Sequence, residues 1–488
     1  MTSAAQVRER LDHPVIDADG HTIEFMPAVR EVLSSLAGND VSTKLFESPT
    51  GLGTGWYRRS AEQRAATRQV RAPWWGVPAE NTLDRTTAML PGLLDERLGE
   101  LGIDYAVVYP TSGLQACGHP VTELRQALCR AINTYHAEVF APHKYRLTPV
   151  AVIPMHTPEE AIAELDHAVG TLGMKAVMMA GIVERPIGAV QEAAPAAARY
   201  ARWIDSLGID SAYDYDPVWQ RCVDLKVSPA FHSGGMGWGS RASMHNYMFN
   251  HLGHFAAAGE ATCRSLFMSG VTKRFPTLRL AFLEGGVGWA SNLYNDIIGH
   301  WEKRNRETVL RYDPRRLDVD LMERLFRSHG GPVVARLQGD LRARLERYRT
   351  SFEPEEMLDE WAPIGLERAE DVIDRFARPF YFGCEADDPM NAMAFDTRLN
   401  RFSARLQAIF SSDIGHWDVP DMREVLEEAY ELVEHELLSE DDFRDFTFAN
   451  VTRLYGEANP SFFEGTAVAD ACRSELATGP ATATVPTD

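Results

Sequence analysis

Residues 15–24 read VIDADGHTIE, a short apolar run that ends in acids and a histidine. Short apolar runs bounded by Gly, Pro or charged residues are typical of strands that are buried on both faces of a parallel sheet. Eight such runs lie at residues 15–19, 105–109, 147–153, 176–179, 228–232, 278–283, 380–382 and 408–411. Amphipathic helical patterns separate them, as at 121–141, 158–172, 291–306 and 422–436. This alternation predicts an α/β protein with a (β/α)8 TIM barrel.

The length of the chain predicts large insertions. It has 488 residues, whereas a (β/α)8 barrel typically needs about 250. We therefore expect one barrel domain over residues 1–464, followed by a flexible Ala/Thr-rich tail at 465–488. The surplus is expected in loop and helical insertions at about 35–80, 183–216 and 306–376.

Two of these insertions carry a compositional signal. The first is rich in glycine and has three tryptophans, which fit either packing on the barrel rim or a lid over the substrate; they are Trp56, Trp74 and Trp75. The third has Arg and Glu at helical spacing, which is typical of a solvated helical face, with an oligomer contact as the alternative.

Composition limits the partners. Asp and Glu outnumber Lys and Arg by 70 to 49, which gives a net charge of −21. Such a charge repels phosphate backbones and anionic lipid surfaces, so we expect a small-molecule substrate and neither nucleic acid nor a membrane as partner. Six widely spaced cysteines without a CxxC pair and the lack of an apolar signal segment favour the cytoplasm. We also expect a homo-oligomer such as a dimer.

The polar residues that directly follow the strands predict a metal site. In a (β/α)8 barrel the active site lies at these strand ends. The first run ends in Asp19 and His21, which are two apart and can face the same side of an extended chain. His232 follows the fifth run, Glu284 the sixth and Asp413 the eighth. Carboxylates and imidazoles gathered at four strand ends are ligands for a divalent ion.

Further polar residues lie near these ligands in the sequence. Asp17, Glu24 and His416 are candidates for additional ligands or for side chains that orient the ligands. His251 and His254, three apart on one expected helix face, fit either acids and bases that act on the substrate or ordinary helix packing.

Two other polar groups have less specific interpretations. The acids after the seventh run fit a solvated loop or a helix N-terminus; they are Glu385, Asp387 and Asp388. Three arginines of the first insertion could bind a substrate carboxylate, namely Arg58, Arg59 and Arg71.

Four motifs carry a resemblance to a known family. They are DADGHTIE at 17–24, FHSGG at 231–235, RFPTLRLAFLEGGVGW at 274–289 and FSSDIGHWD at 410–418. In this order they resemble the strand-end motifs of the amidohydrolase-related family of the metal-dependent amidohydrolase superfamily. That family includes aminocarboxymuconate-semialdehyde decarboxylase and the resorcylate decarboxylases. FTFANVTRLYG at 446–456 is similar to the family's final helix.

The resemblance implies roles for individual residues. Metal binding falls to Asp19 and His21, to His232 and to Asp413. In hydrolytic relatives the last of these also accepts a proton from water that the metal activates. The family's decarboxylases have a histidine after the sixth strand, where this chain has Glu284. Because a carboxylate repels a carboxylate substrate, this departure argues against decarboxylation and leaves Glu284 as a ligand or a base.

The ligand set leaves the metal and the reaction open. Three carboxylates and two imidazoles suit manganese or iron as well as zinc, and they could balance one or two divalent ions. We predict a metal-dependent hydrolase or lyase that uses activated water to hydrolyse or cleave a small organic substrate, aromatic or carboxylated. A dinuclear non-haem iron or iron/manganese oxygenase is the main alternative. A decarboxylase and a non-catalytic partner subunit are two further ones.

Overall fold

The predicted barrel is confirmed. The structure is a computed structural model that describes residues 3–47, 56–73, 79–350, 353–354 and 357–478. Eight parallel strands form one sheet in the order β1 (Ile16–Thr22), β2 (Tyr105–Pro110), β3 (Leu147–Ile153), β4 (Ala176–Met179), β7 (Pro229–Phe231), β8 (Leu280–Phe282), β9 (Phe380–Glu385) and β10 (Gln407–Ser411). Each of the eight expected runs coincides with one of these strands.

The sheet closes between its first and last strands. Just beyond β10, the amide of Asp413 donates to the carbonyl of Asp19, and the amide of His21 donates to the carbonyl of Ile414, both at 3.1 Å. The register of β1 against β2 shifts between Asp17 and Gly20, which places a bulge at Ala18–Asp19. We call this junction between β1 and β10 the seam of the barrel. It lies directly beside the polar end of β1.

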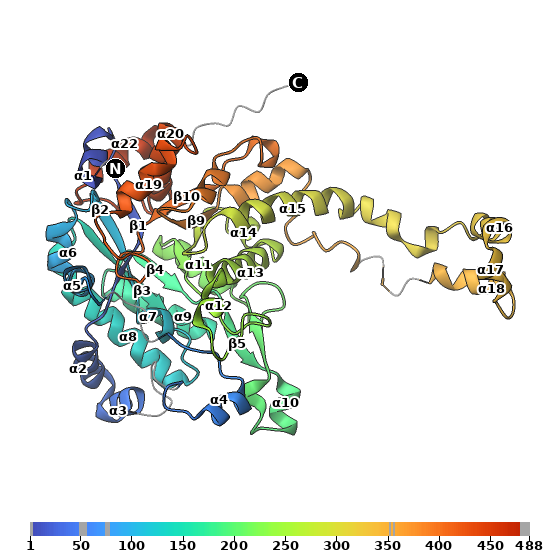
Figure 1. The fold of residues 1–488 in the computed structure, drawn as a ribbon, viewed down its shortest axis with the longest axis horizontal. Coiled ribbons are helices and arrows are strands. Elements are labelled where there is room, and N and C mark those ends of the chain that lie inside the picture. The colour runs from blue at the N-terminus through green and yellow to red at the C-terminus, as the bar shows by residue number, and fades with distance from the viewer. Residues whose placement is uncertain (1–2, 48–55, 74–78, 351–352, 355–356, 479–488) are drawn as a thin grey trace.

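Helices surround the barrel (Figure 1). The long ones that follow strands are α8 (Thr122–Val139), α9 (Pro158–Leu165), α11 (Asp216–Leu225), α13 (His254–Met268), α15 (Gly288–Arg304) and α19 (Val425–Glu434). Thr157 begins α9 with a capping box, and Pro158 occupies its first position. Rings of β8 and β9 pack against α15, with the Trp289 centroid 6.0 Å from that of Phe282 and 5.4 Å from that of Phe382.

Further helices complete the shell. The N-terminal ones are α1 (Ala4–Arg10), α2 (Met26–Ala37), α3 (Asn39–Glu47), α4 (Ala61–Thr67), α5 (Thr82–Met89), α6 (Pro91–Arg97) and α7 (Gly113–Ala116). The later ones are α10 (Gly188–Ala193), α12 (Tyr247–His251), α14 (Val271–Arg274), α20 (Glu440–Arg444) and α21 (Asn450–Gly456). A π-helical turn at Asp445–Ala449 precedes α21, so the expected final helix is present with a wider first turn.

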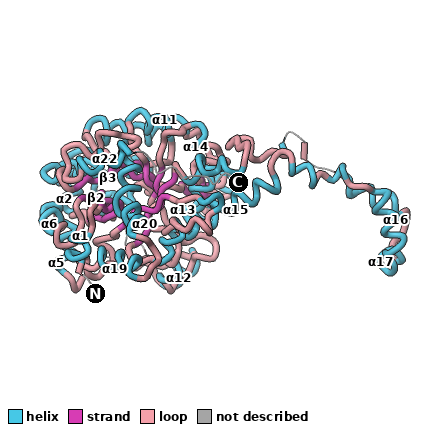
Figure 2. Tube along the Cα trace, turned by 90° about the horizontal axis from the view of Figure 1, so that it is seen from above, coloured by secondary structure: helices cyan, strands magenta, loops and turns pink. Residues whose placement is uncertain are grey.

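The second and third expected insertions have structures of their own. Residues 183–216 contain an antiparallel hairpin of β5 (Val183–Pro186) and β6 (Arg202–Asp205). Residues after α15 form an arm with α16 (Val319–His329), α17 (Gly331–Ala335) and α18 (Leu341–Glu346). Both views show this arm projecting away from the barrel (Figures 1 and 2). Its buried apolar residues form a small cluster separate from the barrel core, made of Val319, Leu341 and Leu345.

The C-terminal segment differs from the flexible tail that we expected. Ala469–Thr478 forms α22, in which Cys472 and Glu475 are buried. Glu475 is bound by Arg444 and Arg453, which tie α22 to the helices before it. Residues 479–488 lie outside the described part of the chain. The alanine-rich sequence is compatible with a helix, and these buried contacts stabilise it.

Two global features bear on the environment of the protein. All six cysteines are buried and none forms a disulfide. In the described ranges, no helix combines the length and the apolarity that crossing a bilayer requires.

Acid sensitivity is expected from His136, a buried residue of α8. Burial lowers its pKa to about 4, with a partial offset from the backbone of Val150, and Glu24 Oε1 is 4.0 Å from its Nε2. The unfolded chain therefore takes up this proton near pH 6.5 and the folded chain only near pH 4. The free energy of unfolding should fall as the pH drops through this window, by about 3 kcal/mol from this group.

Urea unfolding of a His136→Leu variant tests this expectation. Its stability should change less between about pH 7 and pH 4.5 than that of the wild type. The exposed His300 provides the control, because His300→Leu should keep the wild-type slope. Parallel pH profiles for His136→Leu and the wild type would show that another group controls acid unfolding.

Candidate metal centre

The strand ends bring all five predicted ligands together. Nε2 of His21 lies 3.3 Å from Nε2 of His232 and 3.5 Å from Oδ1 of both Asp19 and Asp413. Oε2 of Glu284 is 3.2 Å from the same nitrogen of His232. Two atoms that bind one ion at about 2.1 Å lie roughly 3.0–3.4 Å apart at octahedral or tetrahedral angles. The separations of 3.2 and 3.3 Å lie in this range, the two of 3.5 Å lie just beyond it, and Oδ1 of Asp19 is 4.0 Å from Nε2 of His232.

Several carboxylate oxygens of this group meet no hydrogen-bond geometry with the surrounding protein. Among the described residues, Oδ1 of Asp19, Oε2 of Glu284 and both carboxylate oxygens of Asp413 are buried without a hydrogen bond. Their side chains are at most 5% exposed. Burying a carboxylate without a partner costs several kcal/mol in protein interiors. Because a divalent ion would provide the missing partner, the donor set fits a metal.

Protonation also favours metal binding. Burial lowers the pKa of His21 and of His232 to about 3, so both rings are neutral and offer a lone pair. Burial raises the pKa of Asp19 to about 7, with a partial offset from His232. The pKa values of Glu284 and Asp413 are raised by burial and by neighbouring carboxylates. A bound cation reverses these last shifts because it stabilises the carboxylate form.

Backbone strain is concentrated at two of the acids. Glu284 and Asp413 have φ angles of 55° and 49°, in the left-handed region that residues with a Cβ rarely adopt. Such a conformation costs about 1–3 kcal/mol and occurs most often at functional sites. Gly285 follows Glu284, and a Cβ there would lie 3.2 Å from the backbone of Ala256. The chain thus turns sharply at the carboxyl end of β8.

Asp17 holds the two ligand-bearing strands together. Its Oδ1 accepts from the amides of Asp19 and Ser412 at 3.1 and 3.0 Å, and its Oδ2 accepts from the Ser412 hydroxyl at 2.5 Å. The carboxylate therefore spans the seam between β1 and β10, next to the ligands Asp19 and Asp413. The sequence left two roles open for Asp17, as an additional ligand or as a residue that orients the ligands. This placement fits the orienting role.

The other two candidates near the ligands, His416 and Glu24, differ in their contacts. Nδ1 of His416 is 2.7 Å from Oδ1 of Asp413, and its Nε2 is 3.2 Å from the Thr111 hydroxyl, so His416 belongs to the centre. Glu24 instead accepts hydrogen bonds from the amides of Ser112 and Gly113 at 2.8 and 3.1 Å. Because both its oxygens are bound there, we assign Glu24 no role as a ligand.

His251 and His254 lie on two helices, so the expectation of one shared helix face is wrong. α12 ends at His251 and α13 begins at His254, and Gly253 between them has a φ of 67°. The two rings are nevertheless 4.7 Å apart. The ring of Phe255 packs against both His254 and His232, with centroid distances of 3.9 and 5.1 Å.

Two acids that lie beside Glu284 were not predicted from the sequence, namely Glu385 and Asp418. Glu385, expected in a solvated loop, ends β9, and burial together with nearby acids raises its pKa to about 7. Glu284, Glu385 and Asp418 each offer an oxygen within 4.8 Å of the others. The strand-end rule, applied to the seventh barrel strand, would have identified Glu385. Asp388 does begin a helical turn, where it accepts from the amide of Met390 at 2.9 Å.

The first insertion is attached to the loop after β7. The amide of Arg71 donates to the carbonyl of Ser243 at 3.0 Å, and its guanidinium donates to that of His245 at 2.5 Å. This guanidinium is therefore held by the protein backbone, and Arg58 and Arg59 are exposed. Of the three tryptophans, Trp56 stacks on Arg64, whereas Trp74 and Trp75 lie outside the described residues.

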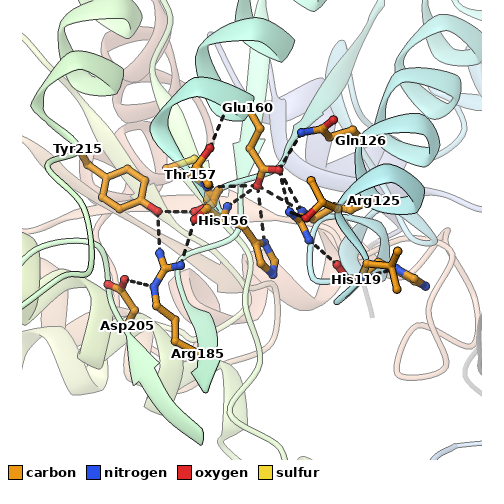
Figure 3. Close-up of polar contacts among 12 residues, drawn as sticks. His119, Arg125, Gln126, His156, Thr157, Glu160, Arg185, Asp205 and Tyr215 are labelled. Carbon is orange, nitrogen blue, oxygen red and sulfur yellow. Dashed lines mark hydrogen bonds and ion pairs between the residues drawn. The ribbon is translucent and has the colours of Figure 1, made fainter. Parts of the chain in front are cut away.

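A polar network fixes the neighbouring loops (Figure 3). Arg125 of α8 pairs with Glu160 of α9 at 2.8 Å, and both side chains are 1% exposed. Arg185 of β5 pairs with Asp205 at 2.5 Å and donates to the carbonyl of His156 at 3.0 Å. These contacts connect the segments after β2, β3 and β4 with the β5–β6 hairpin. The carboxyl end of the barrel is thereby held in place on this side.

A family comparison agrees with this geometry. The model of the amidohydrolase family matches residues 99–328. Over these residues, just under half of its length, the chain is similar to the amidohydrolase family. The resemblance drawn from the four motifs is confirmed by this match.

Solved structures are similar to this chain over most of its length. An amidohydrolase from Mycobacterium avium subsp. paratuberculosis K-10 matches with a TM-score of 0.50 and 16% identity, over 91% of this chain and 98% of that one. A dihydroxybenzoic acid decarboxylase from Polaromonas sp. JS666, solved with manganese and 2-nitroresorcinol, has a TM-score of 0.47 and 15% identity, over 93% and 99%. A 4-oxalomesaconate hydratase from Rhodopseudomonas palustris has a TM-score of 0.44 and 12% identity, over 95% and 99%. At 16% identity the likeness to the first of these structures establishes the fold alone.

Proposed function

We propose that this enzyme is a divalent-metal-dependent hydrolase or C–C lyase whose water attacks an electrophilic carbon of a small organic substrate. The observation that carries the proposal is the convergence of buried, unpartnered ligand atoms from Asp19, His21, His232 and Asp413 at the carboxyl ends of the strands. A divalent ion at such a site supplies a Lewis acid that polarises a carbonyl group and lowers the pKa of water.

Asp413 and His416 are suited to move the proton that water releases. The carboxylate of Asp413 is buried among the ligands, and one of its oxygens can accept a proton. Nδ1 of His416 lies 2.7 Å from this carboxylate, and the hydroxyl of Thr111 holds the far side of its ring. The pair can receive a proton from water and return it to the leaving group.

The charge of the site favours a neutral carbonyl substrate. Glu284, Glu385 and Asp418 lie beside the ligands, and within the described ranges no lysine or arginine pairs with any of them. A substrate carboxylate would be repelled here, which argues for an ester, amide, lactone or diketone. The rings of His251 and Trp417, 5.6 Å apart, offer a surface for a flat or aromatic group.

Metal analysis and turnover of neutral substrates test the proposal. Anaerobically purified protein should contain at least one divalent ion per chain, and chelation should abolish hydrolysis of a responsive ester or lactone. Asp413→Asn should lower kcat by about 100-fold or more because the proton acceptor is lost. Asp470, whose side chain is 96% exposed, provides the control Asp470→Asn. Full turnover by chelated enzyme would overturn the proposal, and dioxygen uptake coupled to product would assign the oxygenase alternative.

A further inference from the structure

We infer that the arm of α16–α18 docks on the acidic α19 segment of a second copy of this chain, so that two chains form a reciprocal dimer. The arm spans residues 306–350 and projects from the barrel in both views (Figures 1 and 2). The α19 segment comprises residues 424–442, that is, α19 with the residues on either side of it. The apolar surface of the arm, its charge and its position relative to α19 carry the inference.

The arm has too few buried side chains to stabilise itself. Among its residues, all of which are described, three apolar side chains are buried, namely those of Val319, Leu341 and Leu345. Five large apolar ones are instead between 44% and 70% exposed; they are Tyr312, Leu321, Leu325, Val333 and Tyr348. Folded units of this size usually need oligomerisation or another external support. The arm therefore needs an apolar partner that its own barrel does not provide.

The apolar stripe of α16 is wider than the core of the arm covers. Met322 and Phe326 are four residues apart on the helix and pack against the small buried cluster. Leu321 and Leu325 have the same spacing on the neighbouring strip of the helix, and they are 44% and 48% exposed. Since an amphipathic helix directs its apolar stripe towards a core, this uncovered strip is the contact surface.

The arm and the rest of the chain have opposite charges. Residues 306–350 hold eleven arginines, no lysine and seven acids, a net charge of +4, which leaves −25 on the rest of the chain. Arg311, Arg336 and Arg347 are exposed and form no ion pair with any described residue. Two arms would repel each other, whereas an arm and a barrel attract. The charge therefore selects the barrel of the second copy as the surface on which the arm docks.

The α19 segment has the complementary charge. Residues 424–442 hold nine acids and neither lysine nor arginine. Burial raises the pKa of Glu428, and four neighbouring carboxylates raise it further, namely those of Asp387, Glu424, Glu431 and Glu427. Across the described ranges, these five carboxylates form no ion pair with lysine or arginine. Arginines of another chain would relieve their mutual repulsion.

The arm points away from the α19 segment of its own chain. In both views α19 lies in the half of the barrel that is remote from the arm (Figures 1 and 2). Leu437 of the segment is 43% exposed and offers an apolar contact among the acids. A second copy can bring arm and segment together, and a twofold axis then forms both contacts at once.

Sedimentation equilibrium of the full chain tests the inference. The wild type should have twice the mass of the 54.5 kDa chain. The double variant Leu321→Glu with Leu325→Glu should raise the dissociation constant of the dimer by about 100-fold or more, because it places acids against acids in an apolar contact. Leu399→Glu is the matched control, since this leucine of the barrel is 55% exposed and its variant should stay dimeric.

Charge reversal identifies the two surfaces. Arg336→Glu with Arg347→Glu in the arm should weaken the dimer by about 10-fold or more, and so should Glu427→Arg with Glu431→Arg in the α19 segment. A chain with all four substitutions should dimerise more tightly than either double variant, because the new acids and the new arginines face each other. Such a departure from additivity is the signature of residues in contact.

Three results would overturn the inference. The first is a monomeric wild type, and its binding to phosphatidylserine vesicles would assign the arm to a membrane surface. The second is a dimer that persists in Leu321→Glu with Leu325→Glu, which would place the interface elsewhere. The third is additivity of the two charge reversals, which would exclude the α19 segment as the partner of the arm. Circular dichroism should show that all variants fold, because every substituted residue is partly or fully exposed.

Discussion

His21→Ala should weaken the binding of the first metal ion by at least about 100-fold, more than the loss of a residue that only orients a ligand. His21 is fully buried, and its Nε2 lies within 3.5 Å of His232, Asp19 and Asp413. This one nitrogen thus faces three of the other proposed ligands. Removing the imidazole therefore takes away a ligand and leaves carboxylates that repel one another.

Calorimetric titration of metal-free protein with Mn²⁺ or Zn²⁺ measures this loss. His300→Ala is the matched control, since it removes an exposed histidine from α15 and should bind metal as the wild type does. Folding of both variants is checked by thermal unfolding in a chelator. If His21→Ala bound metal with an unchanged Kd, the ligand assignment at the end of β1 would be wrong.

Asp17→Ala should cost about 3 kcal/mol of unfolding free energy, because it leaves the amides of Asp19 and Ser412 buried and unpaired. The same variant should weaken metal binding by about 10–100-fold, since both amides adjoin or belong to ligand residues. Asp17→Asn keeps one oxygen that can accept from these amides. This variant should therefore lose less unfolding free energy and less metal affinity than Asp17→Ala.

Urea unfolding and metal titration of the two variants separate the contributions. The expected order of stability is wild type, then Asp17→Asn, then Asp17→Ala, with metal affinity following the same order. Equal stability of all three proteins would mean that the seam between β1 and β10 does not depend on this carboxylate.

The barrel and the clustering of five polar strand-end residues could be predicted because both follow from local signals. Short apolar strands buried on both faces are visible as runs, and a (β/α)8 barrel places its chemistry directly after them. Asp19, His21, His232, Glu284 and Asp413 all satisfied this rule, and the structure brings them together. The bulge at Ala18–Asp19 and the seam bonds of Asp17 depend on the partner strand, so no local pattern predicts them.

Other features were missed for identifiable reasons. Glu385 was assigned to solvent because neighbouring acids suggested a loop, although it ends a strand like the other ligands. Asp418 lies five residues past Asp413, and only the fold of the loop returns it to the centre. The break between His251 and His254 is marked by Gly253, which adopts a left-handed conformation that ends one helix and begins the next.

The arm of α16–α18 has a hydrodynamic consequence. It stands away from the barrel in both views and exposes apolar side chains, with Leu321 at 44%, Leu325 at 48% and Val333 at 70%. Such a projection adds friction while adding little mass. A single chain should therefore elute from a sizing column ahead of a compact protein of 54.5 kDa. Light scattering reports mass independently of friction and therefore gives the correct number of subunits. In X-ray scattering, the arm should set the largest dimension of the particle.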